Sequence, residues 1–240
     1  MKTLSLKLCY LISIFVAVIL SSCEYKIIYP ENSKPVLRHI ALTFDDGPDP
    51  VYTGMILDVL KEKEAKATFF LIGNKMNQYP EVTKRIFSEG HILANHSFDH
   101  MRLSGMPFNL VYKDIMQTEN IITKICGSSL KLFRPPFGTL TNEQTDSLHK
   151  YGFKVVMWDF PFTNYNIDEM IEYIISVECD NQIILLHSAD YSGKESRMHI
   201  VLGLPKIIDK LRSQGYVFIK VNELDSTTTI SKNRKHLIQE

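Results

Sequence analysis

Short apolar runs alternate along the chain with longer stretches in which apolar residues recur every three or four positions. Runs rich in β-branched and aromatic residues are typical of buried strands, and the periodic stretches are typical of amphipathic helices. This pattern predicts seven strands, at residues 39–44, 67–72, 91–95, 132–135, 153–158, 182–186 and 217–221. It predicts helices between them, at residues 51–62, 81–89, 109–125, 142–151, 167–178 and 198–214.

Start and stop signals support these helices. Gly90, Gly152 and Gly215 follow three of them, and glycine is a common residue at helix C-termini. Thr141 and Asn166 precede two others and can cap their first turns. Strands that alternate with helices predict an α/β fold with a parallel sheet, most simply a single-domain β/α barrel. Such barrels carry their functional groups at the carboxyl ends of the strands.

Polar residues stand at the ends of five predicted strands. They are Asp45-Asp46-Gly-Pro, His96-Ser-Phe-Asp-His100, Arg134-Pro-Pro-Phe-Gly138, Trp158-Asp159 and Leu-Leu-His187-Ser. Adjacent side chains on a strand point to opposite faces, so two neighbouring carboxylates can take two roles. A bound metal keeps such charges together, and two imidazoles four residues apart reach one ion in a helix or tight turn. Taken alone, a motif of this kind also fits a surface turn or a buried core histidine. Five such motifs at successive strand ends favour a single functional site.

The chain resembles the polysaccharide deacetylase family, the NodB-homology carbohydrate esterases of family 4. The resemblance rests on four motifs in order: Thr-Phe-Asp-Asp-Gly-Pro at 43–48, His-Ser-x-x-His at 96–100, Arg-Pro-Pro-Phe-Gly at 134–138 and Leu-Leu-His-Ser at 185–188. It covers residues 37–224. It implies a distorted, incomplete (β/α)7-type barrel with parallel strands and a metal-dependent enzyme that removes acetyl groups from polysaccharides.

The residues themselves suggest which groups carry the chemistry. Asp46, His96 and His100 form the open ligand set of a catalytic zinc site, although cobalt, nickel or iron also suit these ligands. Asp45 is then the candidate general base. The resemblance adds Arg134 as the group that orients this base, the backbone N–H of Phe137 as an oxyanion donor and His187 as the general acid. It also implies substrate contacts from Pro136, Tyr165 and Leu185.

One motif departs from the family pattern. Many members carry an Asp-Trp pair whose aspartate supports the acidic histidine, whereas alignment from Trp158 gives Asn164-Tyr165 here. Asparagine cannot favour an imidazolium by charge, so we expect a lower pKa for His187 than in members with the carboxylate. Asp159 and Asp190 are alternative partners. A carbohydrate-binding protein with little turnover is therefore the alternative to an enzyme.

The N-terminal segment is typical of an export signal. Lys2 and Lys7 precede an apolar run, residues 8–20, that is short for a membrane span, and Leu-Ser-Ser-Cys23 follows. We expect a lipoprotein signal over residues 1–22, lipid attachment at Cys23, a spacer over 23–36, the deacetylase domain over 37–224 and a solvated tail over 225–240. An uncleaved anchor is the alternative. Both place the domain in the bacterial cell envelope, tethered to a membrane.

Composition limits the kinds of partner that the chain is expected to bind. A chain of 240 residues with 45% hydrophobic content can form one well-packed domain. The 27 basic and 27 acidic residues balance, and the body of the chain has no basic block, which argues against nucleic acid. Cys126 and Cys179 can form a bridge after export, but two thiols are favoured because this size needs no staple.

The expected substrate is an N-acetylated glycan such as peptidoglycan, chito-oligosaccharide or poly-N-acetylglucosamine. O-acetyl esters of polysaccharides are the alternative, because the same chemistry cleaves both bonds. No protein partner is predicted.

Overall fold

The computed structural model describes residues 37–161, 166–178 and 180–224. Within them every strand pairing is parallel. The strands are β1 (Arg38–Asp45), β2 (Thr68–Leu71), β3 (Ile92–Asn95), β4 (Leu132–Phe133), β5 (Lys154–Val155), β6 (Phe160–Pro161), β7 (Gln182–His187) and β8 (Tyr216–Phe218). The helices are α2 (Tyr52–Glu62), α3 (Gly73–Gln78), α4 (Pro80–Ser88), α5 (Phe108–Cys126), α6 (Asn142–Lys150), α7 (Ile167–Val177) and α8 (Met198–Ser213). Three short 3-10 turns are η1 (Leu103–Gly105), η2 (Pro136–Gly138) and η3 (Val221–Glu223).

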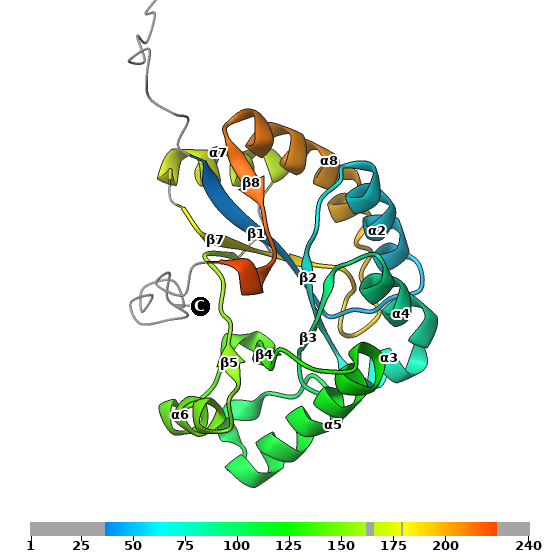
Figure 1. Ribbon diagram of the computed structural model, residues 1–240, viewed down its shortest axis with the longest axis vertical. Coiled ribbons are helices and arrows are strands. Elements are labelled where there is room, and N and C mark those ends of the chain that lie inside the picture. The colour runs from blue at the N-terminus through cyan, green and yellow to red at the C-terminus, as the bar shows by residue number, and fades with distance from the viewer. Residues whose placement is uncertain (1–36, 162–165, 179, 225–240) are drawn as a thin grey trace, which may run out of the picture. The chain divides into compact units, whose positions relative to one another are not determined.

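The sheet is curled rather than flat. Its strand order is β5-β4-β3-β2-β1-β7-β6, and β8 pairs with β1. The consecutive strands β5 and β6 therefore lie at opposite ends of this order, although only residues 156–159 join them. Such a link spans at most about 18 Å, so the two edges must approach each other. Helices lie around the outside of the curl (Figure 1), which confirms the predicted distorted, single-domain β/α barrel.

Alternate residues of the strands belong to two different cores. Ile40, Leu42 and Phe44 pack with apolar residues of α2 and α8 in the largest buried cluster. Ala41, between them, joins Phe70 and other residues in a second buried cluster that contains no residue of an α-helix. The first face of β1 therefore points outward to the helices, and the second points into the curl.

The starts and ends of several helices carry the capping residues that the sequence predicts. Thr141 and Gln144 exchange the two hydrogen bonds of a capping box at the start of α6. Gly90, Gly152 and Gly215 have φ angles of 82°, 82° and 84°, which fit glycine after a helix.

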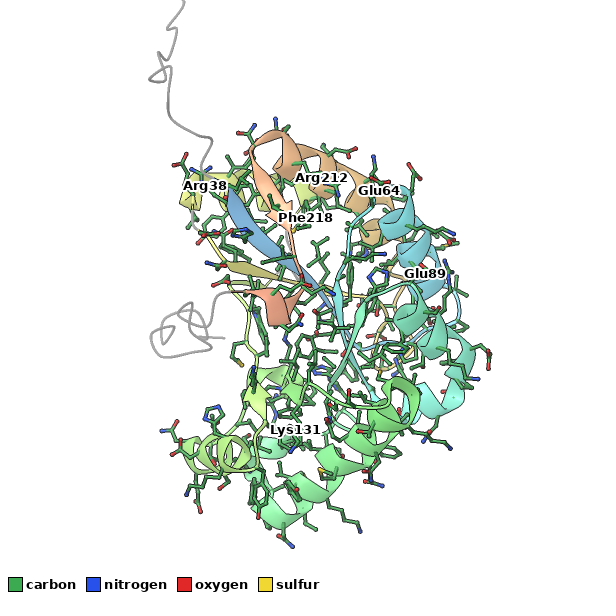
Figure 2. The ribbon with its side chains drawn as sticks, viewed as in Figure 1. Arg38, Glu64, Glu89, Lys131, Arg212 and Phe218 are labelled. Atoms are coloured by element: carbon green, nitrogen blue, oxygen red, sulfur yellow. The ribbon has the colours of Figure 1, made fainter. Side chains whose placement is uncertain are left out.

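Charged side chains at the surface connect the ends of neighbouring helices and strands (Figure 2). Arg212 donates to the backbone oxygen of Glu64 at 3.2 Å, and its guanidinium lies 5.7 Å from the centre of the Phe218 ring. These contacts link α8 to the turn after α2 and to β8.

Some predicted bounds differ from the structure. The fifth strand is predicted to reach residue 158 but ends at Val155, because the next two carbonyl oxygens accept hydrogen bonds from Arg134 instead of a strand. The short elements α3 and β6 were not predicted. Cys126 carries a free, half-buried thiol. No helix in the described part of the chain has the length and apolarity needed to cross a membrane. Cys23, Cys179 and both predicted terminal segments lie outside the described residues.

Candidate metal centre and active site

Strand alternation carries three of the predicted polar side chains into the curl. On β1, Asp45 shares a face with the inward-pointing Ala41. Beyond β4, Arg134 is two residues after the inward-pointing Leu132. On β7, His187 pairs in register with Asp45 of the neighbouring β1. The sequence therefore brings an acid, a guanidinium and an imidazole to one end of the sheet interior.

The two adjacent carboxylates face the same imidazole. Asp45 Oδ2 lies 3.8 Å from His96 Nε2, and Asp46 Oδ1 lies 3.4 Å from the same atom. The expectation that they point to opposite faces is wrong, because β1 ends at Asp45 and Asp46 has a φ of 69°. This left-handed conformation turns the second carboxylate back toward the site.

The residue after them, Gly47, is required by a close approach between strands. A Cβ atom here would lie 2.5 Å from Ser188 Oγ, which is shorter than real side chains allow. The backbone N–H of Ser188 donates to the oxygen of Asp45 at 3.0 Å. Gly47 therefore lets the ends of β1 and β7 meet directly beside the site.

A tight turn, rather than a helix, brings the two histidines together. The backbone N–H of His100 donates to Ser97 Oγ at 2.9 Å, and the N–H of Ser97 donates to Asn95 Oδ1 at 3.0 Å. Asn95 Nδ2 in turn donates to Glu119 Oε2 of α5 at 2.9 Å. Ser97 and His100 have φ angles of 66° and 54°, so the turn is held by side-chain hydrogen bonds from both ends.

The three predicted metal ligands form one compact cluster. Asp46 Oδ1 lies 3.4 Å from His96 Nε2 and 3.2 Å from His100 Nε2. One ligand atom from each residue lies within 4.8 Å of the others. A tetrahedral zinc ion with bonds of 2.0–2.1 Å requires ligand separations of about 3.3 Å. Two of the observed separations match this value, so the cluster fits a small divalent cation.

The hydrogen bonding of His96 also fits a cation. Its Nδ1 lies 2.8 Å from the backbone oxygen of Arg134, and a carbonyl can only accept, so Nδ1 carries the proton. In the neutral ring, the lone pair of Nε2 then faces Asp46. Asp46 Oδ1 is buried and has no hydrogen-bond partner among the described residues. A cation between these atoms would satisfy both.

Without a metal, charge interactions shift the pKa values of the same groups. Burial works against a charged His96, but Asp45 and Asp46 outweigh it and raise the pKa of this imidazole. Burial likewise opposes ionisation of Asp46, but His100 and His96 lower its pKa. In the absence of a metal, the opposite charges of His96 and Asp46 therefore favour the charged form of each other.

Arg134 is fully buried and fixes one oxygen of Asp45. Its Nη1 donates to Asp45 Oδ1 at 2.7 Å and to Thr43 Oγ1 at 2.8 Å. Its Nε and Nη2 donate to the backbone oxygens of Val156 and Met157, and its guanidinium lies 4.0 Å from the centre of the Phe70 ring. Burial lowers the pKa of Arg134, and Asp45 opposes that shift.

His187 lies at the end of β7 beside this pair. Burial lowers the pKa of His187, against the pull of Asp46 and Asp45, and the cation of Arg197 adds to the decrease. The carboxylate of Asp190 accepts hydrogen bonds from Arg197 and from its own loop, and Asp159 Oδ2 accepts one from the N–H of Ile183. Asp190 and Asp159, the alternative partners expected for His187, therefore accept these hydrogen bonds from other residues.

The remaining predicted site residues have mixed outcomes. Pro136 and Leu185 are buried, whereas Phe137 is 43% exposed and has a left-handed conformation with φ 58°. Tyr165 and its neighbour Asn164 lie outside the described residues.

Three neighbours of the site were not predicted. Lys75 Nζ donates to the backbone oxygens of Asp46 and Asp190, at 3.1 and 2.7 Å. The ring of Tyr191 stacks on His100. Thr43, which contacts Arg134, stands two residues before Asp45 on the same strand face, so alternation would have found it. Lys75 and Tyr191 lie on an unpredicted helix and a loop, where no periodic pattern marks them.

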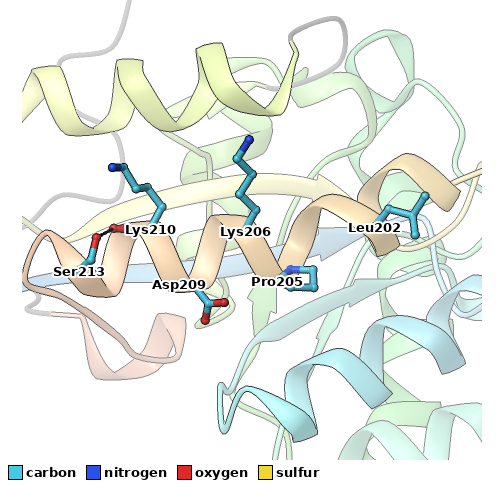
Figure 3. A pocket seen from close by; sticks show the side chains of 6 residues that line it. All are labelled: Leu202, Pro205, Lys206, Asp209, Lys210 and Ser213. Carbon is cyan, nitrogen blue, oxygen red and sulfur yellow. Dashed lines mark hydrogen bonds between the residues drawn. The ribbon is translucent and has the colours of Figure 1, made fainter.

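A separate hollow lies on the surface of α8 (Figure 3). All six lining residues come from that helix: Leu202, Pro205, Lys206, Asp209, Lys210 and Ser213. None of them is a predicted site residue.

A curled parallel sheet with a carboxylate and two imidazoles at its carboxyl ends defines a β/α-barrel protein with a candidate metal centre. The family model described as polysaccharide deacetylase matches residues 32–156. The chain belongs to the polysaccharide deacetylase family, and the resemblance drawn from the four motifs is confirmed.

Named relatives agree with this assignment. A peptidoglycan-N-acetylglucosamine deacetylase of Bacillus cereus is 33% identical over 200 residues, 81% of this chain and 90% of the relative. The crystal structure of the Bc1960 peptidoglycan N-acetylglucosamine deacetylase matches with a TM-score of 0.73 and 30% identity, over 80% of this chain and 89% of that one. The peptidoglycan deacetylase PdaC from Bacillus subtilis matches with a TM-score of 0.66 and 33% identity, over 80% and 92%.

Proposed function

We propose that this protein is a metal-dependent deacetylase that removes N-acetyl groups from an envelope glycan, with peptidoglycan as the first candidate. The observation that carries the proposal is the cluster of Asp46, His96 and His100 beside the ion pair of Asp45 and Arg134. The peptidoglycan deacetylases among the relatives support the choice of glycan.

Asp46, His96 and His100 would hold the ion. When bound, a divalent cation lowers the pKa of a coordinated water and polarises the acetyl carbonyl. Asp45 would accept a proton from the attacking water. Two distances support this role: Arg134 holds its Oδ1, and its Oδ2 lies 3.8 Å from His96 Nε2, on the side of the metal ligands.

Two further groups complete the reaction. The backbone N–H of Phe137 is the proposed donor to the oxyanion, and such a donor is often worth about 3–4 kcal/mol. His187 is the proposed acid: as the carbon–nitrogen bond breaks, it gives a proton to the departing amine. The products are acetate and a glycan with a free amino group.

Acetate release tests this proposal. The chain from residue 24 onward should release acetate from purified peptidoglycan and chito-oligosaccharides, lose this activity with EDTA and regain it with zinc. Asp45→Asn should reduce turnover at least a hundredfold, since general acid–base groups contribute about 10²–10⁴-fold. Acetate release from acetylxylan tests whether the protein acts on the alternative substrate, an O-acetyl ester. Sustained acetate release in EDTA would contradict the proposal, and glycan binding without release would favour a binding protein.

We also propose that the domain is exported and tethered through a lipid on Cys23. The signal-like N-terminal sequence supports this location, which matches an envelope substrate. Metabolic labelling with a palmitate analogue should mark the full-length protein but not its Cys23→Ser variant, and equal labelling of both would contradict lipid attachment at this thiol.

A further inference from the structure

Three aromatic rings meet beside the metal-ligand cluster. Tyr191, in the loop after β7, stacks on His100 with ring centres 4.6 Å apart and an interplanar angle of 18°. Phe137, in η2, meets His100 edge to face at 4.8 Å and 65°, and meets Tyr191 at 5.9 Å and 81°. Each ring therefore contacts the other two, and one of them belongs to a proposed metal ligand.

Two of these rings remain open to solvent. Tyr191 is 50% exposed and Phe137 is 43% exposed, whereas the side chain of His100 is only 7% exposed. One face of the Tyr191 ring lies against His100, and half of the residue is still exposed to solvent. The ring of Phe137 is also contacted by the guanidinium of Arg102, 4.7 Å from its centre. Tyr191 thus offers the more accessible aromatic face beside the proposed reaction centre.

The loop that carries Tyr191 is fixed to the site. Lys75 Nζ bridges the backbone oxygens of Asp190 and Asp46. The carboxylate of Asp190 accepts hydrogen bonds from Arg197 Nη2 at 3.2 Å and from the N–H of Lys194 at 2.8 Å. Because the residue before Tyr191 is held from three sides, the ring is positioned before any ligand arrives.

We propose that the exposed face of Tyr191, with Phe137 beside it, is a stacking platform for a pyranose ring of the substrate glycan. This inference rests on the proposed function. A neutral sugar offers few charges for recognition, but one face of its ring carries C–H groups that pack on an aromatic face. Such an apolar contact next to the metal ligands would set which sugar reaches Asp45.

Kinetics on two substrates test the platform. Tyr191→Ala should raise KM for a chito-oligosaccharide roughly tenfold, the effect of about 1.4 kcal/mol of lost contact, and leave kcat within twofold. It should leave kcat/KM for 4-nitrophenyl acetate, which has no sugar ring, within twofold. Tyr191→Phe should behave like the parent protein, because the ring and not the hydroxyl makes the contact.

Tyr151→Ala is the matched control. Tyr151 is 51% exposed and packs on another ring, Tyr112, at 4.5 Å, but it lies at the end of α6 and before β5, at the opposite end of the sheet from the site. This variant should change the kinetic constants for neither substrate. If Tyr191→Ala reduces turnover of both substrates equally and weakens zinc binding, the ring supports His100 only and the platform is refuted.

Equilibrium binding separates this inference from the proposed function. If the parent protein releases no acetate, binding of the chito-oligosaccharide is measured calorimetrically with the Asp45→Asn protein, with and without Tyr191→Ala. Roughly tenfold weaker binding in the double variant would support the platform even though the proposed activity had failed. Equal binding by both proteins, or no binding by either, would refute it.

Discussion

Arg134→Met should strongly destabilise the metal-free protein. The fully buried guanidinium donates to Asp45 Oδ1, Thr43 Oγ1 and two backbone oxygens, and methionine replaces none of these donors. Removing one partner of a buried ion pair costs about 3–5 kcal/mol, because the other charge stays buried without compensation. This loss is a large part of the 5–15 kcal/mol expected for a whole domain.

Urea unfolding can measure this loss through the fluorescence of Trp158, the only tryptophan, which lies 5.5 Å from the guanidinium. Adding Asp45→Asn to Arg134→Met should restore part of the stability, since it removes the uncompensated carboxylate. Arg85→Met is the control: Arg85 forms two ion pairs but is 35% exposed, so its loss should cost at most about 1 kcal/mol. A loss below 1 kcal/mol in Arg134→Met, or strict additivity with Asp45→Asn, would refute the reasoning.

Three further predictions concern groups around the site and the core. Burial lowers the pKa of His91 from 6.5 to about 4, so folding favours its unprotonated form. The resulting stability is complete above pH 6.5 and is lost as the pH falls toward 4. At pH 5 the loss amounts to about 2 kcal/mol. Urea titrations at pH 7 and pH 5 should therefore show a smaller pH effect in His91→Gln, and an equal effect would exclude His91 as its source. Lys75→Met frees the backbone of Asp46 and should weaken zinc affinity about tenfold by calorimetry; unchanged affinity would show that the two backbone hydrogen bonds are dispensable. Asn164→Asp should raise the pKa of the alkaline limb of activity, because an added carboxylate favours the protonated form of His187; an unchanged pH profile would contradict this role.

The presence of the strands could be predicted because it depends on local apolar runs. All seven predicted strands are found, and the polar residues at the ends of four of them lie together at the site, since parallel strands end on the same side. Asp159 instead accepts a hydrogen bond from the N–H of Ile183, near the start of β7. The direction of the second carboxylate did not follow from alternation, because that rule holds only inside a strand and Asp46 has already left it.

Other features depend on contacts between distant segments. The fifth strand ends early because Arg134 takes the carbonyl oxygens of residues 156 and 157, which no local pattern shows. The helix that carries Lys75 has six residues and few apolar positions, so it gives no periodic signal. Tyr191 is recognisable only after folding has placed its ring on His100.

The central claim is that Asp46, His96 and His100 hold one divalent ion that the hydrolysis requires. X-ray absorption at the zinc edge, combined with acetate release from the same samples, tests it most directly. We expect one zinc per chain with two imidazole ligands, and we expect His96→Ala with His100→Ala to abolish both that signal and the activity. Full acetate release by metal-free protein, or an unchanged zinc signal in the double variant, would contradict the claim.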